Sequence, residues 1–200
     1  MKIKTIICIG DSFTQGYGVD LEDKWIANIS IPETYFINCG INGDTTSGML
    51  ARFKYDIIEK HPDYVLITGG INDFIAGSCL DIPQNNYMAM IHQAAAARIF
   101  PIIGIAPSFI PENIRNDWAA FNDFNAVKSK QLQLRKWLIH FSKTFHLPVI
   151  DFYAGLEKYC NENQGINASL LYSDGMHFTK EGNNLISDIA TQKFKKILKR

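Results

Sequence analysis

Three side chains that can together activate a hydroxyl group lie near opposite ends of the chain. Ser12 follows an N-terminal apolar run, and Asp174 and His177 lie three residues apart near the C-terminus. A serine hydroxyl becomes a strong nucleophile when a histidine takes its proton, and an acidic side chain fixes the tautomer of that histidine. Gly175 lies between Asp174 and His177, so their contact can form within one loop. The two segments predict a Ser-His-Asp triad.

Each segment alone also has a purely structural interpretation. Serine is a common N-cap of helices, and Asp174 with His177 resembles a capped helix start. No Gly-x-Ser-x-Gly pattern surrounds Ser12, so the nucleophile elbow of α/β-hydrolases is excluded. The position of Asp174 and His177, directly before the last predicted helix, favours the catalytic interpretation.

Two further segments contain hydrogen-bond donors that could stabilise an oxyanion. Gly43 follows the second predicted strand, where a residue without a side chain lets a backbone N–H approach a ligand. Asn72 follows Gly69-Gly70 after the third predicted strand and offers a side-chain amide. Glycine and asparagine are also ordinary turn residues, so neither segment is decisive alone.

Short apolar runs alternate with longer helical patterns along the chain. The predicted strands are Ile3–Ile9, Thr34–Asn38, Asp63–Thr68, Pro101–Ala106 and Pro148–Phe152. The predicted helices are Ser47–Lys60, Asn85–Ile99, Asn125–His146 and Lys180–Leu198. This alternation predicts a single α/β domain over residues 1–200, a three-layer α/β/α sandwich whose five-stranded parallel sheet has the flavodoxin-like order 2-1-3-4-5. Ligands bind at the carboxyl ends of the strands in such sheets.

Two stretches, Pro107–Phe124 and Cys160–Ser173, show no regular pattern. The first is longer than a normal connection, which indicates either a functional loop or an insertion with short helices. Its aromatic residues could line an acyl pocket or could simply cover the core. These residues are Phe109, Trp118, Phe121 and Phe124.

Composition narrows the classes of function. Twenty basic residues balance twenty acidic ones, so the charge expected of a nucleic-acid-binding protein is missing. No signal peptide or membrane-spanning segment is recognisable. The cysteines Cys8, Cys39, Cys79 and Cys160 are widely spaced, which indicates buried free thiols rather than disulfides or metal ligands. We expect a cytoplasmic protein without a metal or cofactor, and the oligomeric state stays open.

The four segments together resemble the SGNH, or GDSL-type, hydrolase family. The matches are Gly10-Asp11-Ser12, Gly43-Asp44-Thr45, Gly70-Ile71-Asn72-Asp73 and Asp174-Gly175-Met176-His177. Their order and separation agree with the family, and Phe13 replaces the leucine of many members. The resemblance implies that Ser12 is the nucleophile, His177 the general base and acid, and Asp174 its orienting partner. It implies an oxyanion hole formed by the backbone N–H groups of Ser12 and Gly43 and by the Asn72 amide.

The implied reaction is hydrolysis of carboxylic esters or thioesters through an acyl-Ser12 intermediate. Lysophospholipids and short acyl esters are the favoured substrates, because the chain resembles the small lysophospholipase and thioesterase members. The alternatives are a carbohydrate O-acetylesterase and a non-catalytic binding module with the same fold. A metallophosphoesterase is disfavoured because only His177 lies in a candidate segment. We expect Asp11 and Asp73 to stabilise their own turns rather than react.

Overall fold

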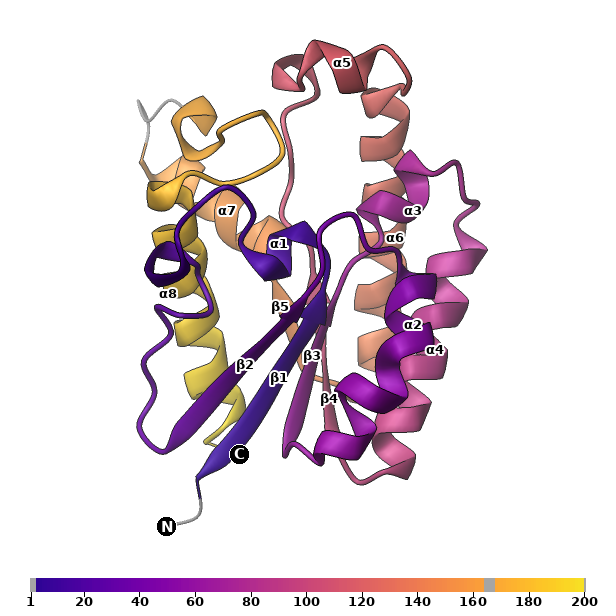
Figure 1. The fold of residues 1–200 in the computed structure, drawn as a ribbon, viewed down its shortest axis with the longest axis vertical. Helices are drawn as coiled ribbons and strands as arrows, with labels where there is room; N and C mark the ends of the chain where they lie inside the picture. Colours follow the sequence, from indigo (N-terminus) through magenta and orange to yellow (C-terminus); the bar gives the residue numbers. More distant parts are fainter. Residues whose placement is uncertain (1–2, 164–167, 200) are drawn as a thin grey trace.

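Five parallel strands form the centre of the molecule. The computed structural model describes residues 3–163 and 168–199. The sheet has the order β2-β1-β3-β4-β5, which confirms the predicted topology (Figure 1). Its strands are β1 (Lys4–Gly10), β2 (Thr34–Gly40), β3 (Tyr64–Thr68), β4 (Phe100–Ile105) and β5 (Val149–Asp151). The register pairs Gly10 with Gly40 and with Thr68, so the three strands end at the same level.

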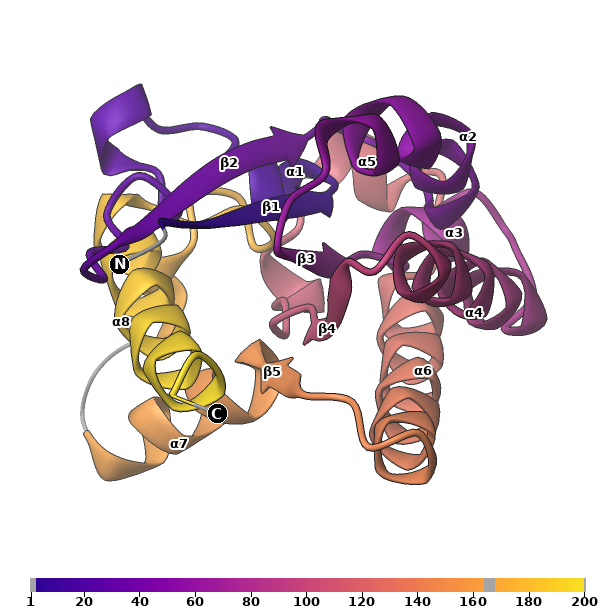
Figure 2. The ribbon, with the colours of Figure 1, turned by 90° about the horizontal axis from the view of Figure 1, so that it is seen from below.

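Helices cover both faces of the sheet, as predicted for a three-layer sandwich (Figure 2). One face is covered by α2 (Thr46–Asp56), α4 (Asp81–Ala96) and α6 (Phe124–Thr144). The other face is covered by α7 (Phe152–Glu162) and α8 (Lys180–Ile197). The short helices α1 (Ser12–Gln15), α3 (Ile71–Ile75) and α5 (Asn116–Ala119) lie toward the carboxyl ends of the strands (Figure 1).

The strands are apolar at successive positions because both of their faces are buried. In β1, Ile7 and Ile9 belong to the core under α2, α4 and α6, whereas Ile6 and Cys8 belong to the core under α7 and α8. All four side chains are completely buried. The sheet is therefore held between two hydrophobic layers, and its carboxyl edge is the part left for a site.

Several helix boundaries differ from the sequence prediction. Helix α4 begins at Asp81 and not at Asn85, because Pro83 lies in the first turn, where its missing N–H is not needed. Helix α2 ends at Asp56 and is followed by a 3₁₀ turn over Ile58–Lys60. Phe152 was predicted to end a strand but is the first residue of α7, a helix that the prediction missed.

The two irregular stretches contain short helical segments. Residues 107–124 include a 3₁₀ turn at Pro111–Asn113 and α5, in agreement with the predicted alternative of an insertion with short helices. The stretch Cys160–Ser173 was wrongly predicted to be irregular at its start, since α7 continues to Glu162. A 3₁₀ turn occupies Ala168–Leu171, and residues 164–167 lie outside the described part of the chain.

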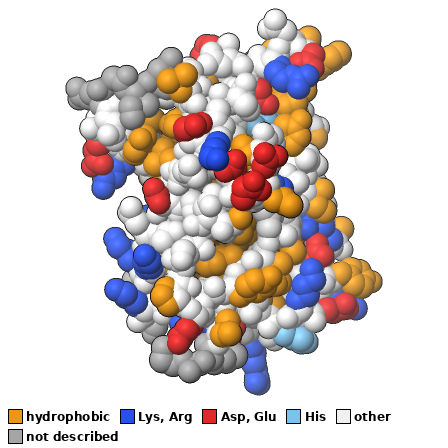
Figure 3. Space-filling view, turned by 60° about the vertical axis from the view of Figure 1, so that its left-hand side comes forward, with side chains coloured by type: hydrophobic (Ala, Val, Ile, Leu, Met, Phe, Trp, Pro, Cys, Tyr) orange, Lys and Arg blue, Asp and Glu red, His pale blue; other side chains and the backbone are white. Residues whose placement is uncertain are grey.

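Acidic and basic side chains both occur across the face shown in Figure 3, with apolar side chains between them. The expectation of buried thiols holds for Cys8 but is wrong for Cys79, which is exposed. Cys39 and Cys160 are partly buried, and all four cysteines are free. Among the described residues, no helix is both long enough and apolar enough to cross a membrane. A cytoplasmic location and the absence of nucleic-acid partners stay predictions.

Candidate active site

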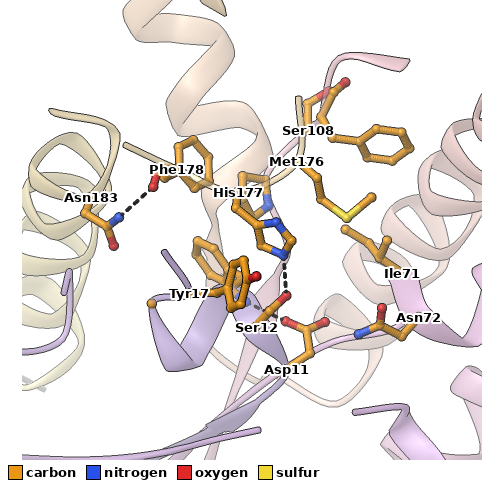
Figure 4. Close-up of a pocket in the computed structure, with 14 residues that line it drawn as sticks. Asp11, Ser12, Tyr17, Ile71, Asn72, Ser108, Met176, His177, Phe178 and Asn183 are labelled. Atoms are coloured by element: carbon orange, nitrogen blue, oxygen red, sulfur yellow. Dashed lines mark hydrogen bonds between the residues drawn. The ribbon is translucent and has the colours of Figure 1, made fainter. Parts of the chain in front are cut away.

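The turn after β1 presents Ser12 at the carboxyl edge of the sheet. Asp11, and not Ser12, is the N-cap of α1, and its carboxylate accepts a hydrogen bond of 3.0 Å from the backbone N–H of Phe13. Gly10 allows this tight turn, because a Cβ atom there would collide with Thr14 Oγ1 and the carbonyl of Thr68. The capping interpretation of Ser12 is therefore wrong, and its hydroxyl points toward His177 (Figure 4).

The three predicted triad residues are connected by hydrogen bonds, from Ser12 to His177 and from His177 to Asp174. His177 Nε2 is 3.0 Å from Ser12 Oγ, and His177 Nδ1 is 2.7 Å from Asp174 Oδ2. The other carboxylate oxygen of Asp174 accepts hydrogen bonds from the backbone N–H groups of Met176 and His177. These contacts hold the carboxylate and the imidazole rigidly within one loop. The arrangement allows a proton to pass from Ser12 to His177 while Asp174 fixes the tautomer.

Burial and hydrogen bonding oppose one another at Asp174. Burial raises the pKa of its carboxyl, but the hydrogen bonds from the His177 ring and backbone outweigh burial and lower the pKa below its usual value. His177 is 8% exposed. The ring of Tyr17 lies 4.5 Å from the imidazole and that of Trp118 lies 5.7 Å from it, measured between centroids. The histidine is thus enclosed by two aromatic rings and its carboxylate partner.

The predicted oxyanion donors lie beside Ser12. Gly43 has φ +74°, a conformation that glycine adopts without strain, and no atom occupies the space where a Cβ would project. The Asn72 side-chain amide donates one hydrogen bond of 2.9 Å to the carbonyl of Asp44. An amide nitrogen has two hydrogens, so the second remains for a ligand. Gly43 and Asn72 line the same cavity as Ser12 and His177.

The two other acidic residues of the matched segments have different partners. Burial raises the pKa of Asp11 to about 7, against the hydrogen bond from Phe13. Asp73 accepts hydrogen bonds from the backbone N–H and the hydroxyl of Thr46, at 2.9 and 2.6 Å. Asp11 therefore stabilises its own turn as expected. Asp73 also joins α3 to the start of α2, because its buried carboxylate accepts both hydrogen bonds from Thr46.

A cavity of about 560 Å³ opens from Ser12 and His177 toward α5. Trp118, Phe121 and Phe124 line it, as expected for an acyl pocket. Phe109 does not line it: its side chain is 1% exposed, packs edge-on against Phe124, and borders only a narrow inner cavity of about 30 Å³ beside Ser12. Phe109 therefore borders the inner part of the site rather than the wider cavity, and its part in binding an acyl group stays a prediction.

The sequence matches the GDSL-like lipase/acylhydrolase family over residues 8–185. The chain belongs to this family. Esterase TesA of Pseudomonas aeruginosa is 31% identical over 120 residues, which are 56% of this chain and 60% of that esterase. The chain therefore spans less than two thirds of that relative. Thioesterase 1/protease 1/lysophospholipase L1 of Escherichia coli is 23% identical over 92% of this chain and 80% of its own length.

Solved structures of GDSL-type proteins have the same fold. A lipase/acylhydrolase from Enterococcus faecalis is 25% identical with a TM-score of 0.76, and the match covers 96% of both chains. A lipolytic protein from Desulfitobacterium hafniense is 24% identical with a TM-score of 0.75, covering 94% of this chain and 98% of that one. These findings confirm the predicted resemblance and the predicted class of enzyme, a carboxylic ester hydrolase.

In this GDSL-type chain, sequence reasoning missed Tyr17, Ile75 and Met176, which line the cavity. Met176 lies within the matched segment beside His177, so its position was a usable signal. Tyr17 lies two residues after α1 and Ile75 is the last residue of α3, and no periodic pattern distinguishes them. Within residues 3–163 and 168–199, no group of three or more His, Cys, Asp or Glu side chains is placed to hold a metal ion.

Proposed function

We propose that this chain is a serine hydrolase that cleaves carboxylic esters through an acyl-Ser12 intermediate. The observation that carries the proposal is the continuous series of contacts from Ser12 Oγ to His177 Nε2 and from His177 Nδ1 to Asp174. Residues separated by 165 positions meet at hydrogen-bonding distance, at the edge of the sheet where a substrate can enter.

In the proposed reaction, Ser12 Oγ attacks the carbonyl carbon of the ester and its proton passes to His177 Nε2. The negative charge on the former carbonyl oxygen is stabilised by the backbone N–H groups of Ser12 and Gly43 and by the free hydrogen of the Asn72 amide. His177 then protonates the leaving alcohol, which departs and leaves the acyl group on Ser12. A water molecule, deprotonated by His177, attacks this acyl-enzyme, and the bond to Ser12 Oγ breaks as His177 returns the proton to Oγ and the carboxylic acid leaves.

The cavity supports an ester with an apolar acyl group. Ile75, Trp118, Phe124 and Met176 line it together with the exposed Phe121. A volume of about 560 Å³ is in the range of sites that bind small molecules, so a short or medium acyl chain fits. The esterase and the thioesterase/lysophospholipase relatives are consistent with esters, thioesters or lysophospholipids as substrates.

Polar side chains in the same cavity favour a second candidate substrate. Asn42, Asp117 and Asn122 border the cavity and could hydrogen-bond to a hydroxylated leaving group. An O-acetylated sugar would place its acetyl group at Ser12 and its ring hydroxyls against these residues. Comparing kcat/KM for acyl esters, acyl thioesters and acetylated sugars distinguishes the two candidates.

The Ser12→Ala variant tests the proposed function. We expect it to lose hydrolysis of a short p-nitrophenyl ester by at least about 10³-fold, because it removes the nucleophile. The matched control is Ser129→Ala, since Ser129 is exposed on α6 and does not border the cavity. A fluorophosphonate probe should label Ser12 alone in the wild-type protein, as peptide mapping would show. Retained turnover in Ser12→Ala, or labelling of another serine, would contradict the proposal.

A further inference from the structure

The side chain of Arg52, on α2, makes four hydrogen bonds although it is only 17% exposed. Its Nε donates to Asp44 Oδ2 at 2.8 Å, and Nη1 donates to Asp56 Oδ2 at 2.7 Å. Nη1 also donates to the carbonyl of Cys39 at 2.9 Å, and Nη2 donates to the carbonyl of Gly10 at 3.1 Å. One guanidinium group therefore holds two carboxylates and two backbone carbonyls.

Two of these acceptors belong to segments that carry the oxyanion donors. Gly10 ends β1 two residues before Ser12, and Asp44 directly follows Gly43. The carbonyl of Asp44 also accepts the hydrogen bond of the Asn72 amide. Arg52 thus connects the Ser12 turn to the Gly43 loop directly, and reaches Asn72 through Asp44.

Arg52 also balances the charge of Asp44 near the reaction centre. Burial is the main cause of the raised pKa of Asp11 and of Asp73, and the negative charge of Asp44 adds a smaller contribution to both. The charge of Asp44 therefore acts on two carboxyl groups next to the oxyanion donors. Without a cation beside it, this carboxylate would disfavour the oxyanion that forms next to Gly43. Gly48 makes the ion pair possible, because a Cβ atom at that position would collide with Asp44 Oδ1.

We propose that Arg52 is a positioning residue that sets the geometry of the oxyanion donors and neutralises Asp44. The inference rests on the proposed function. The planar guanidinium suits this role because it donates in several fixed directions, whereas a lysine ammonium on a flexible stem cannot reach all four acceptors at once. Arg52 is not among the residues that line the cavity, so we place it behind the donor segments rather than against substrate.

The test compares Arg52→Met and Arg52→Lys with the control Arg135→Met. Arg135 forms a bidentate pair with Asp151 at 24% exposure, so it is a comparably buried ion pair that touches none of the donor segments. We expect Arg52→Met to lose about 10²-fold in kcat with a change in KM of only a few-fold, because small displacements of donors mainly affect the transition state. The rate of fluorophosphonate labelling should fall in parallel, and Arg52→Lys should recover part of both losses. Arg135→Met should lower thermal stability but keep kcat.

Gly48→Ala is the second variant, for the case in which Arg52→Met does not fold. It leaves Arg52 in place and displaces Asp44, so we expect a smaller loss of kcat in the same direction. Equal kcat losses in the Arg52 and Arg135 variants, or a raised KM with unchanged kcat in Arg52→Met, would overturn the inference about Arg52. Labelling of Ser12 in the wild-type protein would still uphold the proposed function. A wild-type protein without esterase activity or Ser12 labelling would overturn both.

Discussion

Two carboxylates beside Ser12 have pKa values shifted in opposite directions. His177 donates to Asp174 and keeps its pKa low, so this side chain is ionised at neutral pH. Asp11 is 4% exposed and its pKa is raised to about 7, so near neutral pH it changes between its neutral and charged forms. The environment, rather than the residue type, decides which carboxylate supplies the constant negative charge.

The raised pKa of Asp11 predicts a pH-dependent stability. Between pH 3.8 and about 7, the folded protein keeps a proton on Asp11 that the unfolded chain has already lost. The unfolded state then binds fewer protons, so the contribution of Asp11 to the free energy of unfolding falls as the pH rises through this window and is constant above it. We expect Asp11→Asn to melt several degrees above wild type at pH 8, with the difference vanishing toward pH 4. If the melting temperatures of Asp11→Asn and wild type differed by the same amount from pH 4 to pH 8, the raised pKa of Asp11 would be contradicted.

At the scale of elements, the segment over residues 107–124 forms the outer wall of the cavity. Its inner part is fixed by hydrogen bonds from Gln131 to the carbonyl of Pro107 and from Tyr172 to the carbonyl of Ser108, both 2.7 Å long. Its outer part carries Trp118, whose ring lies 4.9 Å from the Arg115 guanidinium and meets the His177 ring edge-on. Helix α5 therefore supplies Asp117 and Trp118 to the cavity wall.

We expect Trp118→Ala to lower kcat/KM about tenfold for esters with apolar acyl chains of six to eight carbons, since it removes apolar surface from the cavity wall. Acetate esters should be affected much less, because an acetyl group offers little apolar surface to this wall. The measurement is a chain-length series of p-nitrophenyl esters. Phe100→Ala is the control, because Phe100 is 48% exposed at the start of β4, away from the cavity. An equal effect on all chain lengths would remove Trp118 from the acyl site.

The parts of the site that follow strands could be predicted from the sequence. Ser12, Gly43 and Asn72 follow β1, β2 and β3, and parallel strands bring their carboxyl ends to one edge. The start of α7 was missed because Phe152 lies close behind Val149 and Ile150 and was assigned to their strand, although Asp151 before it is the N-cap of α7. The orientation of Phe109 in an aperiodic segment was also undetermined, since an aromatic side chain can fill a core or line a pocket equally well.

At the scale of the whole molecule, the sheet joins two separate hydrophobic layers. Phe53 on α2 and Phe194 on α8 are completely buried on opposite faces. The strands between them contribute alternate side chains to each layer, so neither layer is complete without the sheet. Loss of either layer should therefore destabilise the other.

We expect Phe53→Ala and Phe194→Ala each to lower the free energy of unfolding by about 3–5 kcal/mol. Because the layers share the sheet, both variants should unfold in one cooperative transition when followed by far-UV circular dichroism and by tryptophan fluorescence. The exposed Phe145, on the connection after α6, gives the control Phe145→Ala, which should cost less than about 1 kcal/mol. Two separated transitions in either variant would show that the layers unfold independently.

The distance along the chain between Ser12 and His177 has a consequence for synthesis on the ribosome. The proposed nucleophile leaves the ribosome 165 residues before its base, and the Lys4 ammonium donates a hydrogen bond to the carbonyl of Leu198, just beyond α8. A growing polypeptide therefore holds Ser12 without its base until His177 and the segments that position it have been translated. Esterase activity should appear only after α8 has docked, so the onset of turnover in a translation reaction would time that docking step.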